Sequence, residues 1–267
     1  MRFLPSQEIM KNDFYKYQAQ TTPHPLAIEI SHAKGCYIYD IKGKEYLDFI
    51  AGVSASSLGH CHPKVISAVK NQLDKYLHVM VYGEFIQEPA VELTKLLSGL
   101  LPDNLTTTYL TNSGTEAIEG SMKLARRATG RKEIIYSKKA YHGNTMGALS
   151  IMGVEERKKI FQPLLPNCNS IEFNNEKDIL KITSKTAGVV LETIQGGAGF
   201  IVPKNDYLRK VKNRCSAVGA LLILDEIQPG FGRTGKLFGF EHYDISPDIL
   251  AIGKGMGGGM PIGAFTA

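Results

Sequence analysis

Short apolar runs recur along the chain, and each is followed by polar residues or glycine. Five of them have the length and composition of buried strands: Thr107 to Leu110, Glu133 to Tyr136, Gly188 to Leu191, Leu221 to Leu224 and Asp248 to Ile252. Helix-like stretches separate these runs, which is the pattern of a parallel sheet covered by helices on both faces. The sequence therefore predicts an α/β fold, a three-layer α/β/α arrangement with a mostly parallel sheet.

The N-terminal part of the chain follows a different pattern. Two strand-like segments, Gly35 to Tyr39 and Glu45 to Phe49, flank a turn and predict a strand pair, and an irregular arm precedes them. We therefore expect residues 1–50 to form an arm with a strand pair, and residues 51–267 to form the larger domain.

Two amphipathic helices and a final strand complete the predicted elements. Apolar residues spaced for one helical face predict helices over His62 to Lys75 and Pro89 to Leu101. The segment Pro261 to Ala267 has the pattern of a strand that no closing helix follows.

Composition narrows the class of protein. Hydrophobic residues make up 43% of the 267 residues, enough for the core of one large globular domain. The 31 basic and 26 acidic residues are spread along the chain, without the basic stripe that a nucleic-acid-binding face needs. The four cysteines form no C-x-x-C pair, which argues against a zinc site or a disulfide framework. Residues 1–5 lack the apolar core of a signal peptide and no segment reaches membrane-spanning length, so we expect a cytoplasmic enzyme without metal, membrane or nucleic-acid partners.

Small polar residues follow the first predicted strand of the larger domain. Ser113, Gly114 and Thr115 stand at the start of an amphipathic helix, where unpaired backbone N–H groups and the helix dipole favour an anion. One interpretation is a turn that binds a phosphate, because small residues let it approach the backbone closely. An ordinary N-cap, completed by Glu116, explains the same residues and is favoured when the turn is taken alone.

An acid and a lysine follow two other predicted strands. Asp225 comes directly after Leu221 to Leu224, where a partly buried carboxylate would keep the nitrogen of a heteroaromatic ring protonated. Lys254 stands among glycines after Asp248 to Ile252, where burial would lower its pKa and favour attack on an aldehyde. A solvated acid and an exposed loop lysine are the ordinary alternatives.

Three further side chains are expected at the same edge of the sheet, because ligands gather beyond the carboxyl ends of parallel strands. Tyr141 and His142 follow the strand Glu133 to Tyr136, and the Tyr141 ring either stacks on a flat ligand or merely packs on its loop. Glu192 follows Gly188 to Leu191, and it either orients the surroundings of a ligand or is solvated.

Two nucleotide-binding motifs occur in the wrong context. Gly230 to Gly235 match the dinucleotide-binding spacing G-x-G-x-x-G, and Gly230 to Lys236 nearly match a P-loop. Residues Asp225 to Pro229 separate the segment from its strand, no helix pattern follows it, and Leu237 stands where a P-loop needs Ser or Thr. The sequence therefore argues against both kinds of nucleotide site.

Taken together and in this order, the motifs resemble those of the class III pyridoxal-phosphate (PLP) aminotransferases. The segments that carry the resemblance span essentially the whole chain: Gly59 to Pro63, Thr111 to Ala117, Tyr141 to Gly143, Glu192 to Gly196, Leu224 to Gln228, Gly230 to Gly235, and Gly253 with Lys254. The resemblance implies the major domain of a PLP-dependent transferase of fold type I, with PLP as cofactor.

The resemblance also implies which residues bind the cofactor. They are Ser113, Gly114, Thr115, Tyr141, His142, Glu192, Asp225, Gln228 and Lys254. Among them, Gly114 and Thr115 would donate to the phosphate, Tyr141 would stack on the ring, and Gln228 would lie near the ring hydroxyl. Arg233, in the glycine-rich segment, would be structural.

The catalytic residues implied by the resemblance are Lys254 and Asp225. Lys254 would form a Schiff base with the cofactor and then move a proton between substrate and cofactor, while Asp225 would hold the ring nitrogen. The reaction implied is a two-stage transfer of an amino group from an ω-amino compound to 2-oxoglutarate, in a homodimer with its site at the subunit interface. A racemase, aminomutase or decarboxylase of the same fold, or an inactive scaffold, is the alternative.

Departures from the family pattern bear on the substrate and on the extent of the chain. Asn144 stands where acetylornithine enzymes often carry arginine, and Gly197 where many relatives carry glutamate. The tyrosine that ornithine enzymes place near Val53 is missing, which favours the acetylornithine branch. Family members continue for about a further small domain. We therefore expect this chain to lack the C-terminal small domain, to which residues 1–50 would belong, and to form at most the cofactor-binding part.

Overall fold

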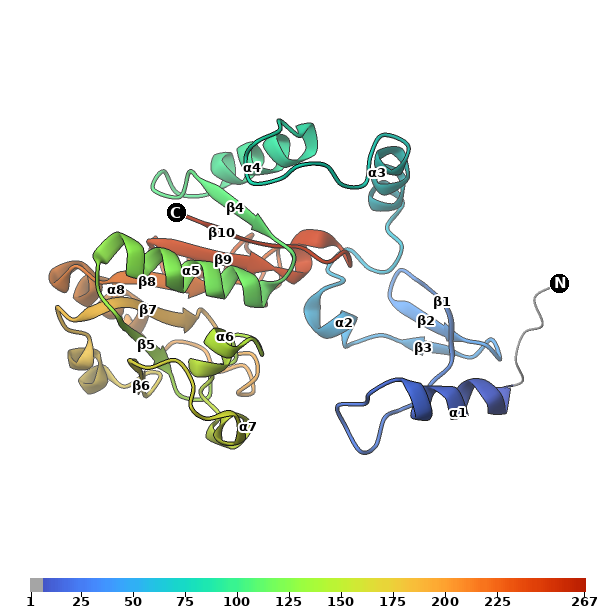
Figure 1. The fold of residues 1–267 in the computed structure, drawn as a ribbon, viewed down its shortest axis with the longest axis horizontal. Helices are drawn as coiled ribbons and strands as arrows, with labels where there is room; N and C mark the ends of the chain where they lie inside the picture. The colour runs from blue at the N-terminus through green and yellow to red at the C-terminus, as the bar shows by residue number, and fades with distance from the viewer. Residues whose placement is uncertain (1–6) are drawn as a thin grey trace.

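The computed structural model describes residues 7–267 and consists of a small antiparallel sheet beside a larger layered body (Figure 1). Residues 1–6, where the sequence predicted no signal peptide, lie outside the described part. The larger body carries all the candidate site residues, whereas the small sheet lies to one side with helix α1 (Gln7–Tyr17) below it.

The small sheet has three antiparallel strands in the order β1 (Ile30–Lys34), β2 (Tyr37–Asp40) and β3 (Glu45–Leu47). β2 and β3 are the predicted strand pair, which is confirmed. The prediction of an irregular arm before them was wrong, because that segment contains α1 and β1. Neither element shows a clear apolar period: α1 is mostly polar, and β1 is exposed at nearly every position.

The large sheet has seven strands in the order β4-β10-β9-β8-β7-β5-β6. Their bounds are β4 Thr108–Thr111, β5 Glu133–Ser137, β6 Cys168–Ile171, β7 Thr186–Glu192, β8 Leu221–Asp225, β9 Ile249–Gly253 and β10 Gly263–Thr266. The strand β10 runs antiparallel to its neighbours β4 and β9, and all the other pairs are parallel, so the predicted mostly parallel sheet is confirmed. All five predicted strands are present, with ends within two residues of the predictions.

The helices connect the strands or precede them. The α-helices are α2 Ala51–Ser54, α3 Pro63–Leu73, α4 Glu88–Leu100, α5 Gly114–Thr129, α6 Met146–Ser150, α7 Glu155–Lys158 and α8 Tyr207–Val218. The 3₁₀ turns are η1 Lys159–Phe161, η2 Glu176–Lys181, η3 Gly239–His242 and η4 Lys254–Gly257. The helices α3 and α4 confirm the two predicted from amphipathic spacing.

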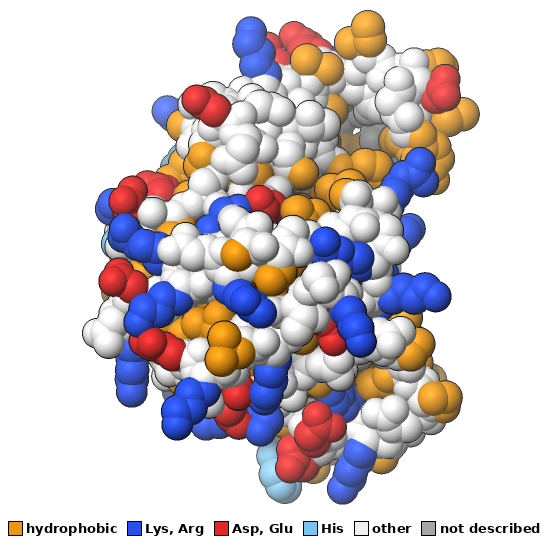
Figure 2. All heavy atoms as spheres, turned by 90° about the vertical axis from the view of Figure 1, so that its left-hand side faces the viewer, with side chains coloured by type: hydrophobic (Ala, Val, Ile, Leu, Met, Phe, Trp, Pro, Cys, Tyr) orange, Lys and Arg blue, Asp and Glu red, His pale blue; other side chains and the backbone are white. Residues whose placement is uncertain are grey.

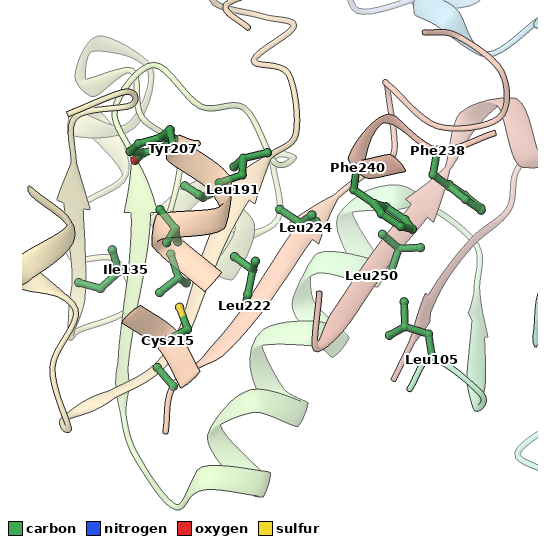
Figure 3. Close-up of a cluster of buried hydrophobic side chains, with 14 of the residues drawn as sticks. Leu105, Ile135, Leu191, Tyr207, Cys215, Leu222, Leu224, Phe238, Phe240 and Leu250 are labelled. Atoms are coloured by element: carbon green, nitrogen blue, oxygen red, sulfur yellow. The ribbon is translucent and has the colours of Figure 1, made fainter. Parts of the chain in front are cut away.

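Two hydrophobic clusters make the larger body three layers thick. On one face of the sheet, Leu222 and Leu224 of β8 pack with Tyr207 and Cys215 of α8 (Figure 3). On the other face, Ile223 of β8 packs with residues of α5. Because successive strand residues point to opposite faces, β8 contributes to both clusters, and nearly every residue of the central strands is buried.

The surface of the described residues carries mixed charges. Basic and acidic side chains are interspersed over the face in Figure 2, with hydrophobic side chains in small groups between them. Across residues 7–267, none of the helices combines the length and hydrophobicity needed to cross a lipid bilayer. Over the same range, no three His, Cys, Asp or Glu side chains are grouped so that they could hold a metal ion. All four cysteines are unpaired.

Candidate active site

Three loops that leave the large sheet meet at one edge of it. Gly253, at the end of β9, faces the turn before α5: a Cβ placed on Gly253 would lie 3.5 Å from Gly114 Cα. Ile227, just after β8, covers the same turn, since a Cβ placed on Gly114 would lie 2.8 Å from Ile227 Cδ1. The strand ends that carry Asp225 and Lys254 and the turn at Gly114 are therefore brought together.

Ser113 is the N-cap of α5. Its hydroxyl accepts a hydrogen bond from the backbone N–H of Glu116 at 3.3 Å, and the Glu116 carboxylate accepts one from the N–H of Asn112 at 2.7 Å. The capping interpretation of this turn is thus confirmed, and it leaves the helix dipole directed at the site. Phosphate binding by the same turn stays a prediction.

Thr115 is held by neighbours on the loop that follows Tyr141. Its hydroxyl lies 2.8 Å from that of Thr145, which donates to Glu119 at 2.6 Å. Gly143 allows this approach, because a Cβ there would lie 2.2 Å from Thr115 Oγ1 and its φ of 127° disfavours other residues. The Tyr141 loop therefore packs directly on the start of α5.

Asp225 and His142 form a buried pair. The Nδ1 atom of His142 lies 2.7 Å from Asp225 Oδ2, and the two residues are 2% and 3% exposed. Burial by itself would lower the pKa of His142, but the hydrogen bond and charge of Asp225 raise it above its usual value. Asp225 Oδ1 also accepts from the N–H of Ile227 at 3.0 Å, so the carboxylate is fixed at both oxygens.

Glu192 is a buried anchor for the backbone of the site. One of its oxygens accepts from the N–H of Tyr141 and the other from the N–H of Gly196, both at 2.9 Å. Burial raises the pKa of Glu192, against the lowering effect of the nearby His142 and of these two donors. The alternative that Glu192 is a solvated surface acid is therefore excluded. The half-exposed Tyr141 ring extends from a backbone that Glu192 holds in place.

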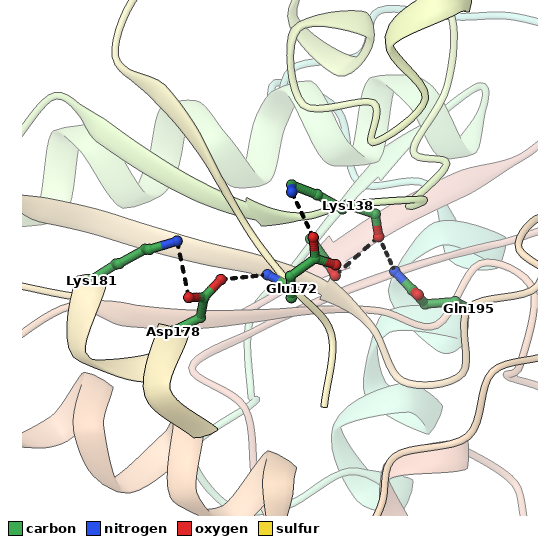
Figure 4. Close-up of polar contacts among 6 residues, drawn as sticks. Lys138, Glu172, Asp178, Lys181 and Gln195 are labelled. Carbon is green, nitrogen blue, oxygen red and sulfur yellow. Dashed lines mark hydrogen bonds and ion pairs between the residues drawn. The ribbon is translucent and has the colours of Figure 1, made fainter. Parts of the chain in front are cut away.

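Polar contacts of Lys138, three residues before Tyr141, tie this loop to the edge of the sheet (Figure 4). Lys138 pairs with Glu172 at 2.5 Å, and the Lys138 carbonyl accepts from the amide of Gln195 at 2.9 Å. Asp178 accepts from the N–H of Glu172 at 2.8 Å and pairs with Lys181 at 3.0 Å. These contacts tie the loops after β5 and β7 to the edge strand β6.

Gln228 fills the space that Gly196 leaves. A Cβ placed on Gly196 would lie 1.6 Å from Gln228 Oε1, and the Gln228 amide donates to the Ser54 hydroxyl at 3.3 Å. Arg233 donates to the Ser54 carbonyl at 3.3 Å and to the Ser57 hydroxyl at 3.2 Å. These two hydrogen bonds to the segment around Ser54 agree with the structural role expected for Arg233.

The glycine-rich segment Gly230 to Gly235 leads into η3 and not into an α-helix, which agrees with the argument against a nucleotide site.

The segment around Ser54 is strained. The four residues of the short element α2, Ala51, Gly52, Val53 and Ser54, have φ values of 49°, 59°, 56° and 70°, so α2 is a left-handed turn and not a regular right-handed helix. Left-handed backbone costs about 1–2 kcal/mol for a residue other than glycine. Asp48 supports the turn, because its carboxylate accepts from the backbone N–H of Ala51 at 2.9 Å. Strain of this kind gathers at functional sites, where the surrounding contacts maintain it.

Lys254 begins η4 directly after the buried strand β9, with a φ of 45°. Burial lowers the pKa of its amine, while the charges of Asp225 and Glu192 oppose that shift only in part. Lys254 therefore lies within electrostatic reach of both carboxylates, and its amine is neutral at a lower pH than that of an exposed lysine. The simple alternative of an exposed loop lysine does not fit this environment.

Comparison with known proteins agrees with this geometry. A family model described as aminotransferase class III matches residues 17–267. The chain belongs to this family.

Named relatives of this class III chain include several transaminases. An acetylornithine aminotransferase of Clostridium acetobutylicum is 42% identical over 90% of this chain and 63% of its own length. A [LysW]-aminoadipate semialdehyde/glutamate semialdehyde transaminase of Sulfolobus acidocaldarius is 42% identical over 85% of this chain and 58% of its own. An ornithine aminotransferase structure from Toxoplasma gondii, whose title describes partial PLP occupancy of its active site, is 33% identical with a TM-score of 0.86. That match covers 96% of this chain and 63% of the other, so this chain spans less than two thirds of these relatives.

Proposed function

We propose that the complete protein is a PLP-dependent aminotransferase, which moves an amino group from an ω-amino compound of the acetylornithine kind to 2-oxoglutarate. The observation that carries the proposal is the convergence of Lys254, Asp225 and the turn at Gly114 at one edge of the sheet. The names of the acetylornithine and semialdehyde transaminases among its relatives support the ω-amino substrate class.

The residues at this edge fit the cofactor. The N-terminal turn of α5 offers backbone N–H groups to a phosphate, and Tyr141 offers a half-exposed ring to a flat ligand. Asp225 keeps unused lone pairs on oxygens that already bind His142 and Ile227, so it can also accept from a protonated ring nitrogen. Gln228, held by Ser54, would lie near the ring hydroxyl. PLP bound there supplies an electron sink for the carbon that loses its proton.

The protein's own side chains transfer the proton and hold the site in position. Lys254, whose pKa burial lowers, carries an amine that gives up its proton more readily than that of an exposed lysine, and this amine can take a proton from the substrate carbon and return it. His142 keeps the Asp225 carboxylate in place through a hydrogen bond between two buried side chains. Glu192 fixes the backbone of Tyr141 and so the height of its ring above the site.

Covalent labelling tests the assignment of Lys254. The full-length protein should gain a visible absorbance band with PLP, and borohydride should fix the mass of the cofactor on the peptide that contains Lys254. Lys236, which is exposed in the loop after β8, is the internal control. Labelling of Lys236 or of another lysine in place of Lys254 would reject the assignment.

An amino-donor screen tests the reaction. Acetylornithine, ornithine, 4-aminobutyrate and other ω-amines are each added without an acceptor, and the amine form of the cofactor is measured. Transamination leaves that form behind, whereas racemisation or decarboxylation regenerates the starting form. No accumulation with any donor contradicts an aminotransferase, and failure to bind PLP favours an inactive scaffold.

We also propose that the protein forms a homodimer in the cytoplasm, with the site at the subunit interface. The segment between α3 and α4 exposes large apolar side chains, with Leu77, Tyr82 and Ile86 at 80%, 82% and 94% exposure. Several strongly exposed large apolar side chains within one segment favour an interaction site there. A monomer in light scattering of the full-length protein would contradict the dimer.

The proposed cytoplasmic location is supported by the four unpaired cysteines, which are compatible with a reducing compartment. The domain boundary near residue 50 stays a prediction.

A further inference from the structure

The loop that follows β8, residues 226–240, runs into η3 and touches four other segments of the candidate site. It packs on the turn before α5, on the loop after β7, on the turn of Lys254 and on the left-handed turn at Ser54. The side chains that make these contacts, in that order, are Ile227, Gln228, Phe231 and Arg233. The position of this loop therefore sets the relative positions of the residues proposed to bind the cofactor.

One buried carboxylate fastens both ends of this loop. Glu226 stands at its start and is 0% exposed. Its Oε1 accepts from the Thr193 hydroxyl at 2.5 Å and from the Phe240 N–H at 2.8 Å, and its Oε2 accepts from the Gly239 N–H at 2.8 Å. Gly239 and Phe240 are at the far end of the loop, while Thr193 follows β7. Both carboxylate oxygens are thus committed to closing the loop and tying it to the neighbouring strand.

We propose that Glu226 is a positioning residue that fixes loop 226–240 and thereby sets the affinity of the site for its cofactor without touching it. The three hydrogen bonds of Glu226 join the start of the loop to its end and to Thr193. An amide in its place would present an N–H₂ group to one of the three donors, so at least one bond would be lost. The loop would then loosen as a unit while the buried strands keep their packing.

Two variants and a matched control test the proposal, which rests on the proposed cofactor. Glu226→Gln removes the carboxylate, and Thr193→Val removes one donor while keeping the shape of the side chain. The control is Glu133→Gln, because Glu133 accepts from the Thr186 hydroxyl at 2.6 Å at the opposite end of β5 and β7. It is the same kind of threonine–glutamate contact, far from the candidate site in the same sheet.

Hydrogen exchange of the cofactor-free, full-length protein gives the first readout. It is measured at pH 8.5, above the pKa of Glu226, which burial raises to about 7 while its donors oppose the shift. We expect peptides from residues 227–240 to exchange faster in Glu226→Gln and Thr193→Val, with peptides of β7, β8 and β9 unchanged. Faster exchange spread over the whole sheet would indicate general destabilisation and overturn the proposal.

The dissociation constant for PLP gives the second readout. We expect it to rise about tenfold in Glu226→Gln, which loses at least one bond and the charge that strengthens the others, and about threefold in Thr193→Val, which loses one bond and keeps the charge. The control should stay within about twofold of the wild type. If Glu226→Gln fails to fold, Thr193→Val decides, and an unchanged constant in a folded variant overturns the proposal. If the wild type itself does not bind PLP, the proposed function fails, whereas hydrogen exchange still tests the loop.

Discussion

Replacing Gly196 by alanine should displace Gln228 from the site and leave the fold intact. The added Cβ would lie 1.6 Å from Gln228 Oε1 and 2.7 Å from Gln228 Cδ, both far inside van der Waals contact. The backbone at Gly196 does not need glycine, because its φ lies outside the left-handed region. These two atoms are at the end of the flexible Gln228 side chain, so the side chain rotates away while the backbone of both loops stays in place.

The cost to stability follows from the one bond that is lost. Gln228 donates to the Ser54 hydroxyl at 3.3 Å, and a bond of this kind contributes about 1 kcal/mol net. For a chain of this size the corresponding fall in Tm is about 2–4 °C. The dissociation constant for PLP should rise about tenfold, since the amide no longer faces the ring hydroxyl. Differential scanning fluorimetry and absorbance titration of the full-length protein measure the two effects.

The neighbouring glycine provides the matched control. A Cβ placed on Gly197 would lie 3.5 Å from Tyr141 Cβ, which is an ordinary contact. Gly197→Ala should therefore leave the dissociation constant within about twofold of the wild type. Equal losses in Gly196→Ala and Gly197→Ala, or an unchanged constant in Gly196→Ala, would refute the reasoning.

Three further predictions follow from the same contacts. In the cofactor-free protein, acetylation of Lys254 followed by mass spectrometry should have a midpoint below pH 10.5, because burial lowers its pKa, and Asp225→Asn should lower it further; a midpoint at or above 10.5 contradicts the burial argument. His142→Phe should cost about 1–3 kcal/mol in urea unfolding, because Asp225 loses a buried partner. Because the pKa of His142 is raised in the folded protein, the stabilisation from its protonated form is complete below pH 6.5 and is lost as the pH rises through the raised pKa. The substitution should therefore lower the free energy of unfolding more at pH 6 than at pH 9, and a larger effect at pH 9 would contradict the prediction. Val53→Gly should raise the free energy of unfolding by about 1 kcal/mol, because it relieves left-handed strain, and a lower Tm would contradict this.

The sheet was predictable where burial on both faces leaves an uninterrupted apolar run. The strands β7, β8 and β9 are buried at nearly every position, and their sequences predicted them with ends within two residues. The edge strand β6, Cys-Asn-Ser-Ile, has two polar residues in its middle and only Ile171 fully buried, so it gave no such signal. The elements α1 and β1 were missed for the same reason, since they bury little.

Candidate residues at the ends of these strands were predictable, but their partners were not. Asp225 and Lys254 follow apolar runs directly, which placed them at the carboxyl edge of the sheet. His142 lies 83 residues from Asp225 along the chain, and no local pattern indicates their pairing. The burial of Glu226 depends on a loop that returns to it at Phe240, and its only sequence signal was its place directly after β8. The left-handed run at Val53 could not be expected either, because valine normally avoids that conformation.

The single antiparallel strand imposes an order on biosynthesis. Within residues 7–267, β10 is the only strand that pairs with β4, and Thr108 and Thr266 are 158 residues apart along the chain. A ribosome must therefore complete β10 before β4 can join the sheet, and until then the nascent polypeptide carries an unpaired strand that is prone to association. Because β4 leads into the turn at Ser113 while β9 leads to Lys254, the two halves of the candidate site come into register only at that late moment.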